Sequence, residues 1–327
     1  MQDTNIIRST KVFEEKISNN LQGINTQSRN YIKDIISLVN KEIGINKILS
    51  ILLFGSQRAK SEAVAVSDCD LLIIFKNRVS NRHIKEIEKY FIALEIKHKF
   101  REFDKKLSKK ILGVIQQTTG IFVSHFLTKI KYWEKANFHK IFRVNKVFSA
   151  IFAPRNIVLG NIITNSTTLY GNEIKEKIRP KIQITFLEMI KSTIMNLMIS
   201  FFSILISLRK KLDPTKYQLE AIKWALRASN FYCFRDSASL ERITKRFISF
   251  EMPRSQKNAE RFFTDFLNLR KTPYNDMNFM LRCPFRIIKI HLKAIINKKL
   301  IKRRMAARIL PKFIEPVIPE RTFPLRF

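Results

Sequence analysis

A glycine-serine pair, Gly55-Ser56, is the first feature of the sequence that could do chemistry, because it ends an apolar run abruptly. Glycine lets a backbone approach a phosphate closely, and a helix that begins after such a turn offers unpaired N–H groups and the positive end of its dipole. The Ser56 hydroxyl can bind a phosphate oxygen, and the positive charges of Arg58 and Lys60 follow closely. This turn is therefore a candidate cradle for the phosphates of a nucleotide.

Two aspartates, Asp68 and Asp70, open the next apolar run after a gap of 11 residues from Ser56. Side chains two positions apart on a strand share a face, so Asp68 and Asp70 project together while Cys69 points to the other face. Attachment points about 6–7 Å apart allow both carboxylates to converge on one divalent ion or on a pair of ions. Ligation by oxygen alone suits Mg²⁺ or Mn²⁺ rather than zinc. With the phosphate cradle, this pattern predicts metal-assisted attack on the α-phosphate of a nucleotide.

Short apolar runs must position these residues. Lys47–Phe54 (KILSILLF) and Asp70–Phe75 (DLLIIF) have the length of buried strands, and Gly120–Ile130 alternates well enough for a third. Helical periodicity covers residues 4–45, 81–97 and 105–117. We therefore predict an α/β (α+β) fold with a small mixed sheet and helices packed mainly on one of its faces.

Beyond Gly171 the pattern becomes helical, with almost no strand signal. We predict four segments: a helical lead-in (1–45), a sheet domain (46–171), an all-helical domain (172–310) and a Pro-rich basic tail (311–327). Phe186 to Leu208 is the most apolar part, but its charge-free stretch is 17 residues long. A membrane-spanning helix needs about 20 residues. We therefore expect a buried helix at the centre of the helical domain and no membrane span.

The composition restricts the partners and the compartment. The chain has 327 residues, enough for two domains, and its 45% apolar content excludes a largely disordered chain. It carries 61 Lys and Arg against 27 Asp and Glu, a net charge of +34, which points to nucleic acid, nucleotide phosphates or an anionic membrane. Three scattered cysteines and five scattered histidines argue against a disulfide framework or a zinc site. The N-terminal residues lack the apolar core of a secretory signal, so we expect a cytoplasmic protein.

The segments LLFGS and DCDLLIIF resemble the signature of the DNA polymerase β-type nucleotidyltransferase superfamily, most closely its minimal nucleotidyltransferases. The resemblance is clear over Lys47–Phe75 and looser out to Gly171. It implies a nucleotidyltransferase-like domain over residues 46–171. It also implies Mg²⁺-dependent (or Mn²⁺-dependent) transfer of a nucleoside monophosphate from an NTP, with ATP expected, to a hydroxyl of RNA, protein or a small molecule. By the resemblance, Gly55 and Ser56 bind the triphosphate, and Asp68 and Asp70 hold the catalytic metal ions.

One departure concerns a third carboxylate, which family members usually carry on a later strand. The strand expected at Gly120–Ile130 offers Ser124 and His125 but no acid. The nearest acids are Glu102, Asp104 and Glu134, and none of them lies convincingly inside a strand. His125 could take a related role, but we favour a packed, hydrogen-bonded histidine.

Two other functions stay open. A degenerate domain could act as a basic RNA- or partner-binding module, since the missing carboxylate and the charge of +34 both fit it. The basic segment Lys289–Arg308 could instead hold a peripheral protein on a membrane, although the surrounding charge favours RNA contact.

A separate motif, Arg286-x4-His291, resembles the catalytic motif of the HEPN ribonuclease domains. This spacing is expected about once by chance in such a chain. We therefore interpret these residues as part of a helix with a basic surface.

Overall fold

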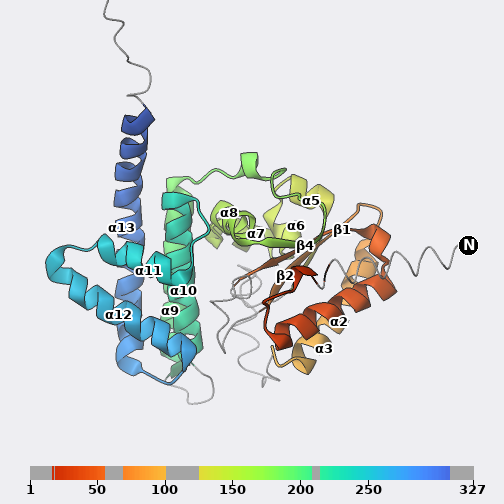
Figure 1. Cartoon of the computed structure of the whole chain (residues 1–327), viewed down its shortest axis with the longest axis horizontal. Helices are drawn as coiled ribbons and strands as arrows, with labels where there is room; N and C mark the ends of the chain where they lie inside the picture. The colour runs from red at the N-terminus through yellow and green to blue at the C-terminus, as the bar shows by residue number, and fades with distance from the viewer. Residues whose placement is uncertain (1–16, 18, 56–68, 101–124, 208–213, 310–327) are drawn as a thin grey trace, which may run out of the picture.

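A four-stranded sheet lies in the N-terminal half of the chain, and helices make up the C-terminal half (Figure 1). The computed structural model describes residues 17, 19–55, 69–100, 125–207 and 214–309. The predicted fold class, a small mixed sheet followed by a helical region, is confirmed. The division into four segments stays a prediction, and the tail from 311 onward lies outside the described residues.

The sheet has the strand order β3-β2-β1-β4. Its strands are β1 (Ile48–Phe54), β2 (Asp70–Phe75), β3 (His125–Lys129) and β4 (Thr167–Gly171). The central strand β1 is antiparallel to β2 and β4, whereas β2 and β3 run parallel, so the sheet is mixed. The two apolar runs predicted as strands are confirmed. We did not predict β4, because its sequence (TTLYG) has no apolar run.

Helices cover both faces of this sheet, so the expectation of helices mainly on one face is wrong. On one face α2 (Thr26–Glu42) and α3 (Asn81–Lys97) pack over Ile51, Leu71 and Ile73. The alternate residues, such as Leu52 and Leu72, pack on the other face. The helices there are α5 (Ile130–Glu134), α6 (Phe138–Ile141) and α8 (Arg155–Asn165), whereas α7 (Lys146–Phe152) packs against α6 and α9. The physical reason lies in the strands: β1 and β2 are apolar at consecutive positions, and such strands are buried on both faces.

Capping side chains fix where the two helices of the first face begin. The Asn25 side chain accepts a hydrogen bond from the Ser28 backbone N–H at 2.7 Å at the start of α2. The Ser80 hydroxyl accepts one from the His83 N–H at 3.0 Å at the start of α3. Each bond satisfies a donor that the first turn of a helix otherwise leaves unpaired. The predicted helix at residues 81–97 is confirmed, whereas that at 105–117 lies outside the described residues.

The C-terminal region is built around α10 (Pro214–Phe234), which has no exposed residue. It packs against α8, α9 and α13, and through α8 it joins the helical region to the sheet. The remaining elements are the short helix η1 (Ile45–Lys47), η3 (Arg179–Lys181), α9 (Phe186–Ser207), α11 (Leu240–Ser249), α12 (Pro253–Lys271) and α13 (Met277–Ile309).

We expected the apolar helix α9 at the centre of the helical region, and this expectation is wrong. Only 44% of its most apolar window is buried, because α10 takes the central position. Within the described residues α9 is long and apolar enough to cross a membrane, over Phe186–Leu205. The pair α7 and α8, bent by 86°, passes the same test only if it is counted as one span.

Candidate active site

Gly55 and Asp70 lie together at one edge of the sheet. The last residue of β1, Phe54, pairs with Asp70, the first residue of β2, so the turn after β1 leaves the sheet beside Asp70. Gly55 has a φ of 79°, a conformation that favours glycine. A Cβ added to Gly55 would lie 2.3 Å from Oδ2 of Asp70. The Asp70 carboxylate therefore occupies the space that any other side chain at position 55 would fill.

The alternation predicted for the start of β2 is confirmed for its described residues. Cys69 is fully buried in the core beneath α2 and α3. Asp70 pairs with Phe54, which packs in the core on the opposite face of the sheet. Asp70 is half-buried, so its carboxylate is neither sealed in the core nor fully open to solvent. This environment suits a carboxylate that binds a cation at the edge of a sheet.

The other predicted site residues, Ser56, Arg58, Lys60 and Asp68, lie outside the described residues. In the described part of the chain no group of three or more His, Cys, Asp or Glu side chains could hold a metal. The residues that are placed nevertheless fit a divalent cation. An oxygen ligand lies directly against a glycine turn, and such a turn leaves room for phosphates.

His125 lies near this edge but faces away from Asp70. It pairs with Leu71, whose side chain packs beneath α2 and α3. There its Nδ1 is 2.7 Å from Oε1 of Glu95, and its ring centroid is 4.9 Å from that of Phe91. The favoured interpretation, a packed and hydrogen-bonded histidine, is confirmed.

Glu95 is a buried carboxylate that the sequence analysis missed. It lies on the inner face of α3, where the other buried residues are Ile84, Ile87 and Phe91. Glu95 continues the helical spacing of these apolar residues, and this spacing is the signal that could have revealed its burial. Burial raises the pKa of the nearby Tyr31 hydroxyl well above its usual value, and the charges of Glu95, Cys69 and Asp70 raise it further. Tyr31 and Glu95 are both buried on the side of the sheet that α2 and α3 cover.

The acid Glu134 does not supply the missing third carboxylate. It ends α5, which follows the far end of β3, and its Oε1 is 2.9 Å from Nζ of Lys177. Because β2 and β3 are parallel, the far end of β3 lies at the edge opposite Asp70. The other two acids, Glu102 and Asp104, lie outside the described residues.

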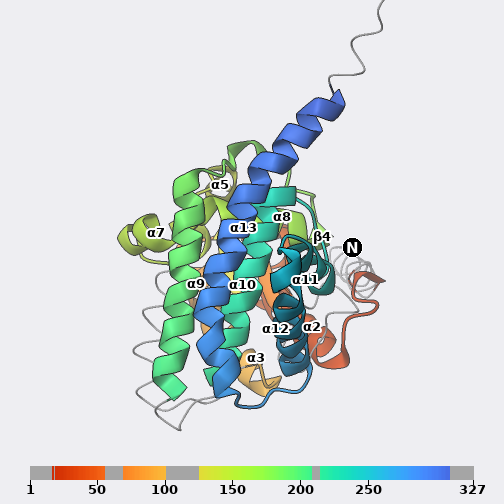
Figure 2. The ribbon, with the colours of Figure 1, turned by 90° about the vertical axis from the view of Figure 1, so that its left-hand side faces the viewer.

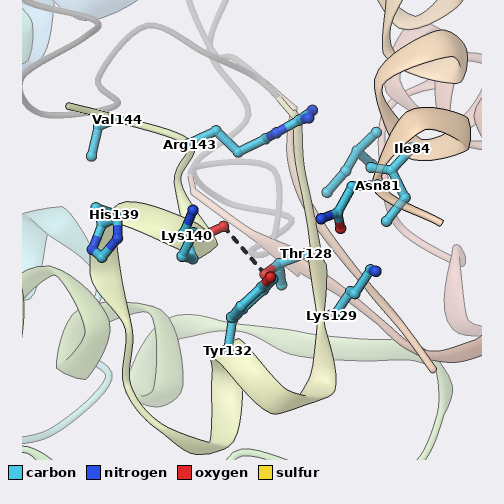
Figure 3. Close-up of a pocket in the computed structure, with 10 residues that line it drawn as sticks. Asn81, Ile84, Thr128, Lys129, Tyr132, His139, Lys140, Arg143 and Val144 are labelled. Carbon is cyan, nitrogen blue, oxygen red and sulfur yellow. Dashed lines mark hydrogen bonds between the residues drawn. The ribbon is translucent and has the colours of Figure 1, made fainter. Parts of the chain in front are cut away.

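A basic cavity of about 310 Å³ lies at that opposite edge. Figure 3 shows it between the start of α3, with Asn81 and Ile84, and the α6 segment, with His139 and Lys140. Burial and the adjacent charge of Lys140 lower the pKa of His139. The cavity residues Leu127–Lys129 are in register with Ile73–Phe75, about 10–17 Å from Asp70 along β2 at roughly 3.3 Å per residue, so the cavity is separate from the candidate active site.

Lys129 is the most unusual residue of this cavity. Its side chain is 6% exposed, and among the described residues it has no hydrogen-bond or ion-pair partner. Arg143, also at the cavity, pairs with Glu88. No acid lines the described wall of the cavity, so the Lys129 charge is uncompensated there.

Arg286 and His291 do not act as a pair. His291 is fully buried, and its Nδ1 is 2.6 Å from the Tyr232 hydroxyl. Arg286 instead donates to Glu251 at 3.1 Å and lies over the ring of Phe262. A fully buried histidine cannot reach an RNA substrate, so both residues serve the packing of α13.

The chain is similar in structure to spectinomycin adenyltransferase AAD(9). That crystal structure, from Enterococcus faecialis with ATP and spectinomycin, matches with a TM-score of 0.44 and 10% sequence identity. The match covers 81% of this chain and 98% of that chain. No family model and no curated protein matches the sequence.

Proposed function

We propose that this protein is a metal-dependent nucleotidyltransferase, which moves a nucleoside monophosphate from an NTP to a hydroxyl acceptor. The observation that carries the proposal is the contact between Gly55 and Asp70. It brings Gly55, from the glycine-serine pair, and Asp70, from the aspartate pair, to one edge of the sheet although they are separated in the sequence. A phosphate cradle and a carboxylate are the two parts that nucleotidyl transfer requires at one place.

Each residue of the proposed site has a distinct task. The Gly55 backbone and the Ser56 hydroxyl hold the β- and γ-phosphates, while Arg58 and Lys60 supply positive charge near them. Asp68 and Asp70 would hold Mg²⁺ or Mn²⁺. The bound metal neutralises negative charge that develops on the phosphates during transfer. The expected nucleotide is ATP, the acceptor class is RNA, protein or a small molecule, and we propose a cytoplasmic location.

The alternative is a catalytically degenerate domain that binds RNA or a partner protein through its basic surface. One observation favours it: His125 faces away from Asp70, and Glu134 lies at the opposite edge. In the described part of the chain neither residue replaces the third carboxylate. A net charge of +34 would suit binding of a polyanion.

Transfer of label from each α-³²P-NTP into a total cell extract tests the proposal. We expect label with the wild type and Mg²⁺, and a loss of at least about 100-fold in the Asp70→Asn variant, because a metal ligand is removed. Asp265→Asn, at a half-buried aspartate of α12 that pairs with Arg282, is the matched control and should keep full activity. Sensitivity of the label to RNase or protease then identifies the acceptor class.

Two results would decide against this function. Equal labelling by wild type and Asp70→Asn would place the chemistry elsewhere. No label with any nucleotide, in Mg²⁺ or Mn²⁺, would favour the binding module. In that case RNA affinity should fall steeply with salt and should not depend on NTP.

A further inference from the structure

The exposed surface of α9 is mainly apolar. Among the described side chains of α9, every exposed one is apolar, and these residues recur at helical spacing along its length. They are Phe186, Leu187, Ile190, Ile194, Met198, Phe201 and Leu205. On a helix at the surface of a soluble protein the polar residues usually face solvent. We therefore expect the exposed side of α9 to contact an apolar partner rather than water.

The buried side of α9, in contrast, carries its polar residues. Glu188, Ser192, Asn196, Ser200 and Ser203 are all buried. The Ser200 hydroxyl donates to Oε1 of Gln218 on α10 at 2.7 Å, and Asn196 Nδ2 is 3.1 Å from Nε2 of His291 on α13. These contacts, together with the buried Met189, Met195 and Ile199, hold α9 on the bundle and leave its other apolar residues outward.

The neighbouring helix α13 continues this apolar surface and adds charge. Its exposed apolar residues are Met277, Leu281, Phe285, Ile288, Leu292 and Ile296, again at helical spacing. Figure 2 shows α13 beside α9 on the side of the molecule turned away from the sheet, and the two helices pack against each other. We call the exposed apolar residues of both helices the α9–α13 face. Phe285 at 72% exposure and Leu205 at 63% show how open this face is.

Cations border the face on α13. Lys289 and Arg282, which also pairs with Asp265, are exposed next to the apolar stripe, whereas Arg286 and Lys293 both pair with Glu251. The sequence of α13 holds ten Lys or Arg (282, 286, 289, 293, 298, 299, 302, 303, 304 and 308) and no Asp or Glu. The one acid of α9, Glu188, is buried. An apolar stripe bordered by Lys and Arg is typical of helices that lie in the surface of an anionic membrane.

We propose that the α9–α13 face lies on an anionic lipid membrane, with its apolar side chains in the headgroup region and the cations of α13 at the lipid phosphates. The charge of the α9–α13 face favours an anionic membrane, rather than a second copy of the chain, as the partner that covers it. Two copies joined through this face would bring the cations of two α13 helices together, whereas anionic lipid neutralises them.

The hydrogen bonds of α9 also indicate whether the helix crosses the membrane or lies on its surface. A helix that crossed the bilayer would have to leave α10 and α13 and expose Asn196, Ser200 and Ser203 to lipid. Unsatisfied polar groups are costly in hydrocarbon. The helix therefore lies on the surface as part of the folded bundle, although its length alone would allow it to span.

Flotation of the full chain with lipid vesicles tests this proposal. We expect binding to phosphatidylcholine–phosphatidylglycerol vesicles and little binding to pure phosphatidylcholine. A triple variant, Phe201→Gln, Phe285→Gln and Leu292→Gln, should lower the affinity for the anionic vesicles by at least about tenfold, because it removes apolar side chains that enter the lipid. The matched control, Tyr90→Gln, Met252→Gln and Tyr274→Gln, changes equally exposed residues outside the face and should bind like the wild type.

A spectroscopic readout keeps the test independent of how well the triple variant folds. The emission of a Phe201→Trp variant should shift to the blue with anionic vesicles, whereas that of Met252→Trp should not. If the triple variant and the wild type bind vesicles equally, the binding comes from unspecific attraction by the net charge. That result would overturn the proposal. No vesicle binding, together with a dimer that the triple variant abolishes, would identify a second copy as the cover and also overturn it.

Discussion

The carboxylate of Asp70 fills the space beside Gly55 that a side chain would need, with Oδ2 only 2.3 Å from the position of an added Cβ. The two residues are brought together by the antiparallel pairing of β1 and β2, which places Phe54 opposite Asp70. Gly55 also has a φ of 79°. Two independent constraints, backbone conformation and space, therefore both require glycine at this position.

The Gly55→Ala variant should lose nucleotidyl transfer, because the new Cβ displaces the Asp70 carboxylate. Its positive φ should also cost about 1–2 kcal/mol in the free energy of unfolding. Gly44→Ala is the matched control, since Gly44 has a φ of 90° and the nearest atom to its Cβ is 3.4 Å away. Label transfer and urea unfolding of both variants check this. Equal activity in the two would mean that the position of Asp70 does not matter for the reaction.

The edge that holds this site was predictable because local signals define it. Continuous apolar runs identify β1 and β2, and Gly55 and Asp70 mark where they end and begin. The pairing of Glu95 with His125 was not predictable, because the partners are 30 residues apart and on different elements. A single sequence does not show which helix face meets which strand.

The position of α9 illustrates a second limit of sequence reasoning. Its high apolar content predicts burial, and burial at the centre follows if the apolar side faces inward. In the structure Asn196 and Ser200 face inward instead, because they form hydrogen bonds with polar side chains of α13 and α10. Those partners lie far away in the sequence, so hydropathy alone assigns the helix to the wrong place.

The Glu95→Ala variant should destabilise the fold by about 1–3 kcal/mol, because it leaves the buried ring of His125 without its hydrogen-bond partner. The free energy of unfolding in urea at pH 7 measures this. Glu88→Ala, which removes the more exposed partner of Arg143, should cost at most about 1 kcal/mol. If the two variants lose the same stability, the Glu95–His125 contact does not contribute specifically.

The Lys129→Met variant should stabilise the protein by about 1 kcal/mol, because methionine keeps the packing of the buried stem and removes a charge without a partner. Thermal unfolding in a buffer without phosphate or sulfate checks this. Lys140→Met, at an exposed residue of the same cavity, should change stability by less than about 0.5 kcal/mol. A loss of stability in Lys129→Met would contradict the prediction and show that the ammonium group has a favourable interaction in solution.

The buried histidine of α13 should make stability fall as the pH is lowered. Burial lowers the pKa of His291 to about 3, and the uncharged side chains of Asn196, Ser229 and Tyr232 surround its ring. The unfolded chain binds a proton at this position near pH 6.5, whereas the folded chain does not. Stability from this residue is therefore present above about pH 6.5 and is lost as the pH falls towards 3.

Urea unfolding at pH 7 and pH 5 measures this dependence. Between these values the wild type should lose about 2 kcal/mol more than the His291→Gln variant, because glutamine binds no proton. His83→Gln, at the first turn of α3, is the control and should follow the wild type. The NMR signal of the His291 ring should not titrate down to about pH 4, since its folded pKa is lower. A titration midpoint near pH 6.5 would show that the ring reaches water, and the polar contacts that hold α9 on the bundle would then open in solution.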